Sequence, residues 1–218
     1  EKEKNAGIET KYKTVGIFFE KNIPFELNKE FDSNREVLDF LNKSKDFKYT
    51  LKMHPAKESK KSPPKPFSTS RLLQVASNVL HTSPKETMSI CQKLYQSGHI
   101  TYMRTESSQY SPVFLKKAEE YITKKYGGAI GDLDKLENKD ANNPHEAIRV
   151  TNIEAPTIAG DEYKEISMYK LIWRNTVESC MTDATYTNIK ATISAPMDLV
   201  YEHTIEIPLK LGWRKVAV

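Results

Sequence analysis

The chain has 218 residues, 38% of them hydrophobic and 28% charged, a balance typical of a soluble globular protein with one large or two smaller domains. Lys and Arg number 33 against 29 Asp and Glu, and the formal net charge of +4 is compatible with a nucleic-acid partner without requiring one. No apolar run is long enough for a membrane span, and residues 1–4 are too charged for a signal peptide. Two cysteines, Cys91 and Cys180, form neither a zinc motif nor a disulfide framework, so we expect both to be buried.

The N-terminal part mixes strand and helix signals. Residues 14–20 predict a buried strand, and residues 49–53 predict a second strand. Ser33 and Glu36 have the spacing of a capping box, which predicts a short helix between the strands. The expected apolar positions of this helix are Val37, Leu38 and Leu41.

A linker follows at residues 56–66, which are rich in Pro, Lys and Ser. Pro63, Pro64 and Pro66 exclude a helix interior or a central strand there. We therefore place a domain boundary in this segment.

The chain then becomes helical. Apolar residues recur at helical spacing over residues 72–80. Ser83-Pro84 starts a second helix that Gly98 ends, and Ser111-Pro112 starts a third that Gly127 ends.

The next segments extend the helical region. Residues 128–143 predict a polar loop, and Asn143-Pro144 predicts the start of a further short helix. Between residues 166 and 180 the apolar positions step by three and four, which predicts a long buried helix.

Alternating apolar and polar residues return at 187–193 and at 201–209, which predicts two strands. Strands at both ends therefore enclose a helical insert. The simplest architecture is an α+β fold in which a β-rich domain is built from both termini and a helical domain is inserted between them.

Residues 98–108, GHITYMRTESS, carry the first candidate for chemistry. Tyr102 and Arg104 are two apart, so their side chains point the same way on an extended segment. A free phenol is largely protonated near neutral pH, whereas a neighbouring guanidinium favours the phenolate and binds phosphate oxygens. The pair suits attack on a phosphodiester, although alone it reads more readily as a half-buried Tyr beside a surface Arg.

The second candidate is HEAIR, residues 145–149. On the predicted helix His145 and Arg149 are neighbours on one face, which could present an imidazole and a guanidinium to one phosphate. Taken alone, this motif reads as a surface helix with an ordinary His.

The two motifs together, in this order and at this spacing, resemble the type IA DNA topoisomerases. Residues 66–108 resemble the active-site region of that family, and residues 145–149 resemble a second family motif. LGWRKV, residues 211–216, looks like the family's return strand. By this likeness, residues 1–61 and 186–218 resemble the β-rich arch domain, and residues 62–185 resemble the helical domain that carries the nucleophile.

The resemblance implies a role for each matching residue. Tyr102 matches the tyrosine that forms the 5′-phosphotyrosine link, Arg104 matches the arginine that assists at the phosphate, and His145 belongs to the catalytic surface. The positions that the resemblance implies for DNA binding are Gln92, Thr101, Thr105, Glu106 and Arg149. Tyr95 and Tyr110 are the nearest other phenols.

Three positions depart from the commonest family pattern. Gln96 stands where many members have Glu, which puts an acid role there in doubt. Glu106 stands where many have Asp, and so keeps the negative charge on a longer side chain. Val150 replaces a Pro after HEAIR and changes only a turn.

The implied cofactor is Mg²⁺, which the family binds through acidic residues on a separate domain that precedes this region. We expect that domain to lie outside this chain, which starts and stops within ordinary globular sequence, and we expect the chain alone not to relax supercoiled DNA. Asp132, Asp134 and Glu137 lie in a glycine-bounded loop at a different spacing, so we expect a solvated loop and no metal site. The implied partners are single-stranded DNA and the Mg²⁺-binding domain of the same enzyme, with a monomer and no membrane.

Two alternatives remain open. A catalytically silent module could bind single-stranded nucleic acid with the same residues. A tyrosine recombinase or type IB enzyme also uses Tyr, Arg and His, but its nucleophile usually follows the His and Arg, whereas Tyr102 precedes His145 and Arg149.

Overall fold

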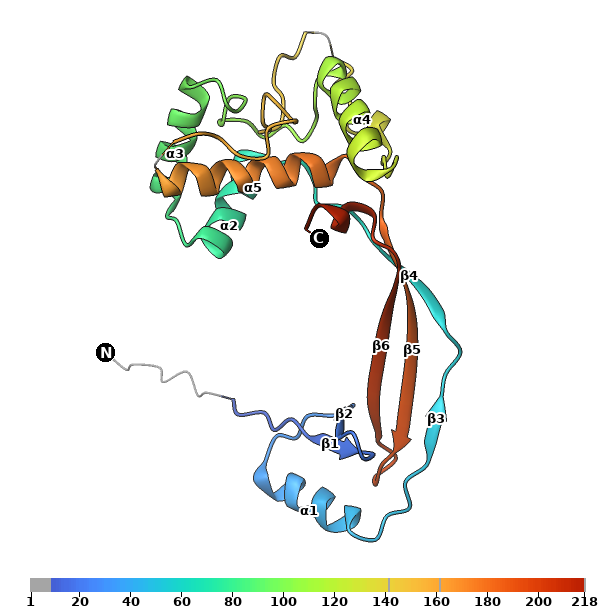
Figure 1. The fold of residues 1–218 in the computed structure, drawn as a ribbon. Helices are drawn as coiled ribbons and strands as arrows, with labels where there is room; N and C mark the ends of the chain where they lie inside the picture. Colours follow the sequence, from blue (N-terminus) through green and yellow to red (C-terminus); the bar gives the residue numbers. More distant parts are fainter. Residues whose placement is uncertain (1–8, 141, 161, 218) are drawn as a thin grey trace, which may run out of the picture. The chain divides into compact units, whose positions relative to one another are not determined.

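The computed structural model describes residues 9–140, 142–160 and 162–217, and Figure 1 shows their mixed α/β fold with an antiparallel sheet. The chain divides into two compact units. Unit 1 comprises the described residues up to Ser59 together with Tyr186–Pro208, and unit 2 comprises Lys60–Thr185 with the described residues from Leu209 onward. No helix in these described ranges is both long enough and apolar enough to cross a membrane.

The sheet has six strands in the order β1-β2-β6-β5-β3, and β4 also pairs with β5. The strand bounds are β1 Val15–Phe18, β2 Ile23–Leu27, β3 Leu51–Met53, β4 Lys57–Lys61, β5 Ala184–Ser194 and β6 Val200–Lys210. The pairings of β1 with β2, β2 with β6 and β3 with β5 are antiparallel. The N-terminal strands therefore join the C-terminal pair in one sheet, which confirms strands at both chain ends.

The core of unit 1 is an aromatic cluster between this sheet and helix α1 (Asn34–Ser44). On β2 the alternation places Phe25 and Leu27 inside and Glu26 outside. The full buried cluster consists of Phe25, Leu27, Phe31, Phe40, Ala191, Ile193, Ala195 and Tyr201.

Helix α1 begins where the capping box predicted, because the Ser33 side chain accepts a hydrogen bond of 3.3 Å from the Glu36 N–H. Of its apolar residues, Val37 packs against the core of unit 1. Phe40 is the fully buried residue, whereas Leu38 and Leu41 are exposed. Apolar spacing predicted the helix, but the bulky aromatic ring fills the space beside Phe31, with the two ring centroids 5.4 Å apart.

One strand prediction in the sheet needs correction. The strand predicted at 14–20 forms only over Val15–Phe18, and it is not buried: Val15 and Ile17 are exposed because β1 pairs only with β2 at the edge of the sheet. The strand predicted at 201–209 is confirmed as β6, in which Tyr201 is buried and Ile205 is exposed. Alternation identifies an extended segment, whereas burial also requires a layer that covers its apolar side.

The predicted linker at 56–66 is shorter than expected, because Lys57–Lys61 forms strand β4. The three prolines follow this strand and leave its ladder with β5 intact. The change from unit 1 to unit 2 falls within the strand, between Ser59 and Lys60.

Unit 2 is helical. Its helices are α2 Thr69–Leu80, α3 Pro84–Gln96, α4 Pro112–Tyr126 and α5 Tyr163–Ser179, with short 3-10 helices η1 Leu133–Lys135 and η2 Gly212–Ala217. The local signals are confirmed: Ser83 caps α3, Ser111 caps α4, and Gly127 ends α4 in the left-handed conformation. These ends are set by side-chain acceptors and backbone freedom that the sequence displays directly.

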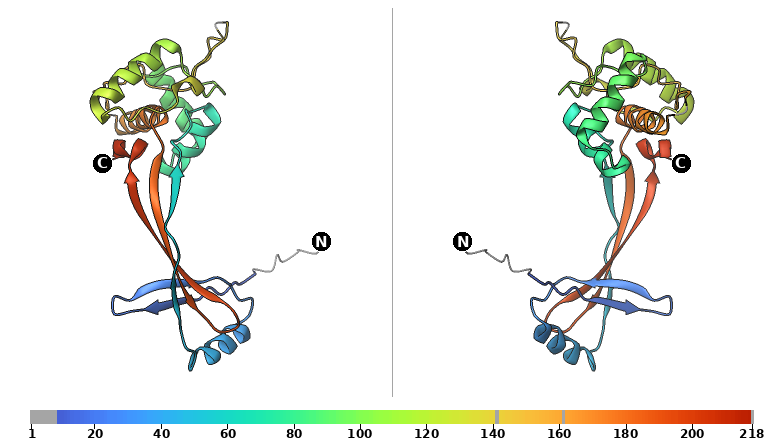
Figure 2. Two further views of the ribbon diagram at one scale, coloured as in Figure 1. Left: turned by 90° about the vertical axis from the view of Figure 1, so that its right-hand side faces the viewer. Right: turned by 90° about the vertical axis from the view of Figure 1, so that its left-hand side faces the viewer.

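Helix α5 holds the helical unit together, and Figures 1 and 2 show it running between α2 and α3 on one side and α4 on the other. Met168, Tyr169 and Ile172 pack into one buried cluster with α2 and α3. Val177 and Cys180 pack into a second cluster with α4. The long buried helix predicted for residues 166–180 is therefore confirmed.

Both cysteines are fully buried, as expected, Cys91 in the first cluster and Cys180 in the second. Burial raises the pKa of each thiol to about 12.

Two predicted elements in unit 2 are wrong. No helix forms over residues 143–149; Ile148 and Val150 instead pair with Phe67 and Ile100 in isolated bridges. The segment at 211–216 is not a return strand, because η2 begins at Gly212.

Gly212 ends β6 because its backbone has a φ of +51°, a conformation that residues with a side chain rarely adopt. A Cβ at this position would lie 2.2 Å from the carbonyl oxygen of Asp183 and 2.5 Å from that of Thr182. The chain therefore needs glycine here for two reasons, backbone conformation and close packing.

We predict that Gly212→Ala destabilises unit 2 by about 2–4 kcal/mol, the sum of a left-handed backbone penalty and overpacking. The control is Gly127→Ala, since Gly127 has a φ of +67° but nothing within 4 Å of its added Cβ. That control should lose only about 1–2 kcal/mol. The measurement is urea unfolding followed by tryptophan fluorescence, because Trp173 and Trp213, the only two tryptophans, both lie in unit 2. Equal losses in the two variants would contradict the packing argument.

Candidate active site

The segment that carries Tyr102 is held by backbone pairing with residues 149–151. The Thr101 N–H donates to the Arg149 carbonyl at 2.9 Å, and the Thr151 N–H donates to the His99 carbonyl at 3.0 Å. Ile100 and Met103 are buried, whereas Tyr102 between them is 46% exposed. The fold therefore anchors the neighbours of Tyr102 and presents its phenol to solvent.

A hydroxyl bridge reinforces this pairing. The Thr101 hydroxyl donates to the Ala147 carbonyl at 2.8 Å and accepts from the Arg149 N–H at 3.0 Å. These bonds, with the Ile148 N–H bonded to the Phe67 carbonyl, occupy the groups that a helix would have used. Long-range pairing thus explains why HEAIR is extended, and Thr101, predicted at the DNA surface, is itself part of the anchor.

The other phenols near Tyr102 differ sharply from it. Tyr95 packs edge-to-face against Tyr102, with ring centroids 5.3 Å apart, and is also exposed. Tyr110 is fully buried, and its hydroxyl lies 2.8 Å from the Ser179 hydroxyl. Burial raises the pKa of Tyr110 well above its usual value, which makes it a poor nucleophile.

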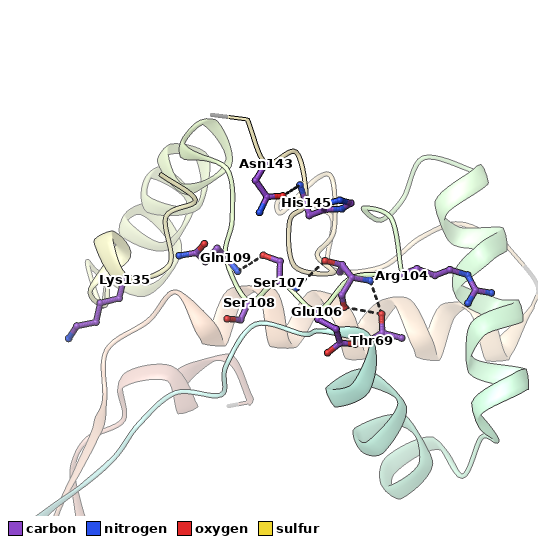
Figure 3. Close-up of a pocket in the computed structure, with 10 residues that line it drawn as sticks. Thr69, Arg104, Glu106, Ser107, Ser108, Gln109, Lys135, Asn143 and His145 are labelled. Atoms are coloured by element: carbon purple, nitrogen blue, oxygen red, sulfur yellow. Dashed lines mark hydrogen bonds between the residues drawn. The ribbon is translucent and has the colours of Figure 1, made fainter. Parts of the chain in front are cut away.

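Arg104 lies between two surface depressions. With Thr69, Thr105, Glu106 and His145 it lines one of about 790 Å³. It also lines a second of about 500 Å³ with Gln92 and other α3 residues. Figure 3 shows the Arg104 side chain directed toward α3, so its guanidinium reaches the side on which Gln92 lies.

The start of α2 supports the chain on both sides of Arg104. The Thr69 hydroxyl lies 2.7 Å from the Met103 carbonyl and accepts from the Thr105 N–H at 2.8 Å. The Thr69 N–H donates to the Thr105 carbonyl at 2.7 Å. The Glu106 carboxylate accepts from the Ser70 hydroxyl at 3.0 Å, and Figure 3 shows Thr69 and Glu106 together below the loop.

His145 and Arg149 do not share a face. His145 is exposed and lines the larger depression. The Arg149 guanidinium instead makes two bonds to the Glu146 carboxylate, at 3.0 and 2.9 Å, and stacks on Phe114 at 4.1 Å from the ring centroid. Its side chain is only 12% exposed, so the helix-face pair predicted from the spacing is wrong.

Glu146 joins this ion pair to helix α4. Its carboxylate accepts from the Ser111 N–H at 2.7 Å, at the first residue before the helix. Burial would raise the pKa of Glu146, but the bonds from Arg149 and Ser111 hold it below its ordinary value. The pair thus fixes HEAIR against the start of α4.

Three positioning groups were missed from the sequence: Thr69, Ser70 and Glu146. A Ser-Thr-Ser run at a helix start indicates capping by Ser68, which the structure confirms, but not the partners of the next two hydroxyls. Glu146 was visible inside HEAIR, yet its partner Ser111 lies 35 residues away. Only the tertiary fold brings these groups together.

The described residues do not supply a fitting Mg²⁺ site. Across 9–140, 142–160 and 162–217 no group of three His, Cys, Asp or Glu side chains is arranged to hold a metal ion. Asp132 instead pairs with Lys135 at 2.9 Å, beside η1. Asp132 is therefore engaged in a local ion pair, and no metal role is assigned to the loop.

Comparison with known proteins gives the family. A family profile described as DNA topoisomerase matches residues 1–218. DNA topoisomerase 1 of Buchnera aphidicola from Schizaphis graminum is 34% identical over 213 residues, which are 95% of this chain and 24% of that protein. DNA topoisomerase 1 of Campylobacter jejuni is 34% identical over 209 residues, covering 84% of this chain and 30% of that protein.

A solved structure agrees with this result. Full-length topoisomerase I from Thermotoga maritima superposes with a TM-score of 0.74 at 27% identity, over 95% of this chain and 36% of that one. The chain thus spans about a quarter to a third of the length of these relatives. With the YMRT and HEAIR motifs on two segments that are hydrogen-bonded to each other, the match places the chain in the type IA DNA topoisomerase family.

Proposed function

We propose that this chain is the DNA-cleaving portion of a type IA topoisomerase and that Tyr102 is its nucleophile. One observation carries the proposal: Tyr102 is an exposed phenol between two anchored residues, Thr101, which is hydrogen-bonded to residues 147 and 149, and buried Met103, whose carbonyl is bonded to Thr69. A nucleophile needs this combination of access and fixed geometry.

In the proposed reaction the Tyr102 oxygen attacks a phosphorus atom of single-stranded DNA. The bond from phosphorus to the 3′ oxygen breaks, the 3′ oxygen leaves as a hydroxyl after taking a proton, and the phosphate stays on tyrosine as a 5′ ester. The reverse attack by the 3′ hydroxyl restores the strand. Because the ester conserves the free energy of the broken bond, resealing needs no ATP.

The neighbouring side chains support this chemistry by charge and position. Arg104 is exposed between two depressions and would bind the phosphate as charge builds up. His145, Thr105 and Glu106 line the larger depression, and Gln92 lines the smaller one. Arg149 would act on DNA only indirectly, since its guanidinium is bound to Glu146.

We further propose that unit 1 corresponds to the arch domain and unit 2 to the helical domain that carries the nucleophile. Unit 1 holds the aromatic sheet core, and unit 2 holds every candidate site residue. Strand passage would then require one unit to move relative to the DNA-bound remainder of the enzyme, a gating step rather than chemistry. The Mg²⁺ that the family resemblance implies would be held by a domain other than the described residues, among which no group of three His, Cys, Asp or Glu side chains could hold it.

We predict that Tyr102→Phe in the full-length enzyme abolishes covalent capture of single-stranded DNA and leaves noncovalent binding nearly unchanged, because phenylalanine keeps the ring and loses only the oxygen. The matched control is Tyr95→Phe, which removes the other exposed phenol of the stacked pair. Denaturing gels measure capture, and filter binding measures affinity. Continued capture by the Tyr102 variant, with loss in the Tyr95 variant, would move the nucleophile to Tyr95.

We predict that Arg104→Ala slows cleavage by about 10²-fold or more, since it removes a charged donor at the developing charge. The control is Arg71→Ala, which deletes another exposed guanidinium in the same unit, bonded to Gln74 at 2.7 Å. Single-turnover cleavage of a labelled oligonucleotide gives the rate constants. Similar rates for the two variants would remove Arg104 from the reaction.

We predict that DNA polarity separates this proposal from a type IB enzyme or tyrosine recombinase. With the full-length enzyme and a single-stranded oligonucleotide, a 3′ label should migrate with the denatured protein, and a 5′ label should run free as a shorter strand. The opposite partition would overturn the mechanism. A silent binding module would give no covalent product with either label.

A further inference from the structure

The Thr69 hydroxyl spans a single residue of the active-site loop, and that residue is Arg104. Its partners are the carbonyl of residue 103 and the N–H of residue 105, at 2.7 and 2.8 Å. The hydroxyl has one proton to donate. The Thr105 carbonyl, 3.0 Å away, already receives the Thr69 N–H at 2.7 Å, so the proton belongs on the Met103 carbonyl.

We propose that Thr69 is a positioning residue that fixes the backbone of Arg104 and thereby aims its guanidinium. The inference rests on the proposed function, in which Arg104 contacts the reacting phosphate. Thr69 is half-buried at the first turn of α2, whereas the Arg104 side chain is exposed. The Thr69 bridge therefore fixes the backbone position from which the exposed guanidinium extends.

A second contact between α2 and the loop lies one residue further along each of them, between Ser70 and Glu106. Ser70 donates its hydroxyl to the Glu106 carboxylate at 3.0 Å, and its N–H lies 3.4 Å from the same carboxylate. Thr69 and Ser70 thus bind residues 103–106 to the rigid start of a helix. The loop carries charged groups at 104 and 106, and both are held from the same turn of α2.

Thr101 makes a second bridge of this kind, in which a threonine hydroxyl bonds to a carbonyl and to an N–H two residues apart. Its hydroxyl spans Ile148 in the same way, between the Ala147 carbonyl and the Arg149 N–H. The Thr101 bridge fixes the segment before and beside Tyr102, and the Thr69 bridge fixes the segment after it. The nucleophile and Arg104 therefore depend on two separate hydroxyls for their relative placement.

The test uses the full-length enzyme with Thr69→Val, which keeps the shape and removes the hydroxyl, and Thr69→Ser, which keeps the hydroxyl. At saturating single-stranded DNA, the valine variant should cleave about tenfold or more slowly, because small displacements of a positioned group cost rate. Its DNA affinity should change less than about threefold, and the serine variant should recover most of the rate. Thr69→Ala repeats the deletion should the valine variant fold poorly.

The matched control is Thr87→Val, which removes a buried hydroxyl bonded to Thr82 at 2.8 Å in the same unit. It should lower stability in urea to a similar degree and leave the cleavage rate unchanged. A slow Thr87 variant would show that general loosening of unit 2 explains the effect, and would overturn the inference.

The decisive measurement combines Thr69→Val with Arg104→Ala. If Thr69 acts through Arg104, the double variant should cleave within about twofold of Arg104→Ala alone, because the group being aimed is already absent. The inference would be overturned if the rate losses of the two single variants multiplied in the double variant, or if the Thr69→Val enzyme cleaved at a normal rate. The proposed function would survive either result as long as Tyr102→Phe stayed inactive. Failure of the proposed function would look different, since Arg104→Ala would then cleave at the normal rate.

Discussion

The pairing of residues 99–101 with residues 147–151 is the constraint on which the site depends. It joins the turn after α3 to a segment 46 residues later at the Thr101–Ala147 bond. The buried side chains of Ile100, Ile148 and Val150 hold the two segments in the core shared with α5. With this layer fixed, Tyr102 has no apolar space to occupy and remains at the surface. Its exposure follows from the packing of its neighbours.

The Glu146–Arg149 pair extends this constraint toward α4. An ion pair with a partly buried guanidinium is stabilising only when its remaining hydrogen-bonding capacity is met. Here the Val150 carbonyl accepts from Arg149 at 3.2 Å, the Ser111 N–H donates to Glu146 at 2.7 Å, and the Phe114 ring covers the guanidinium. Removing one partner would leave a charge near the second core cluster. HEAIR therefore serves the architecture of the site as well as its surface.

Much of unit 2 could be predicted because its signals are local. Ser83, Ser111 and Gly127 fix helix ends through groups within a few residues, and the structure has each where the sequence indicated. Burial of strand residues was harder, since Ile17 and Ile205 have the right alternation but no covering layer. The β4 strand was missed because its five residues, Lys57–Lys61, are polar and its partner β5 lies more than 100 residues away.

In the candidate site, too, the features set by local sequence could be predicted and those set by long-range contacts could not. The YMRT and HEAIR motifs placed Tyr102 and His145 at the surface, but the conformation of HEAIR could not be deduced from spacing four apart. Its acceptors come from Phe67, Thr101 and Gln109, which no local rule connects. Thr69 escaped notice because a hydroxyl at the start of a helix usually bonds within that helix. Its actual partner is 34 residues away.

The burial of both thiols has a practical consequence for following motion in this protein. Cys91 and Cys180 are enclosed in the two helical clusters, and a pKa of about 12 leaves almost no thiolate at neutral pH. Maleimide dyes should therefore not label the native cysteines of this chain in the folded state. One new cysteine at exposed Asp46 in unit 1 and another at exposed Glu119 in unit 2 would accept a donor and acceptor dye. Energy transfer between them could then report on the distance between the units during a catalytic cycle, with both native cysteines left in place.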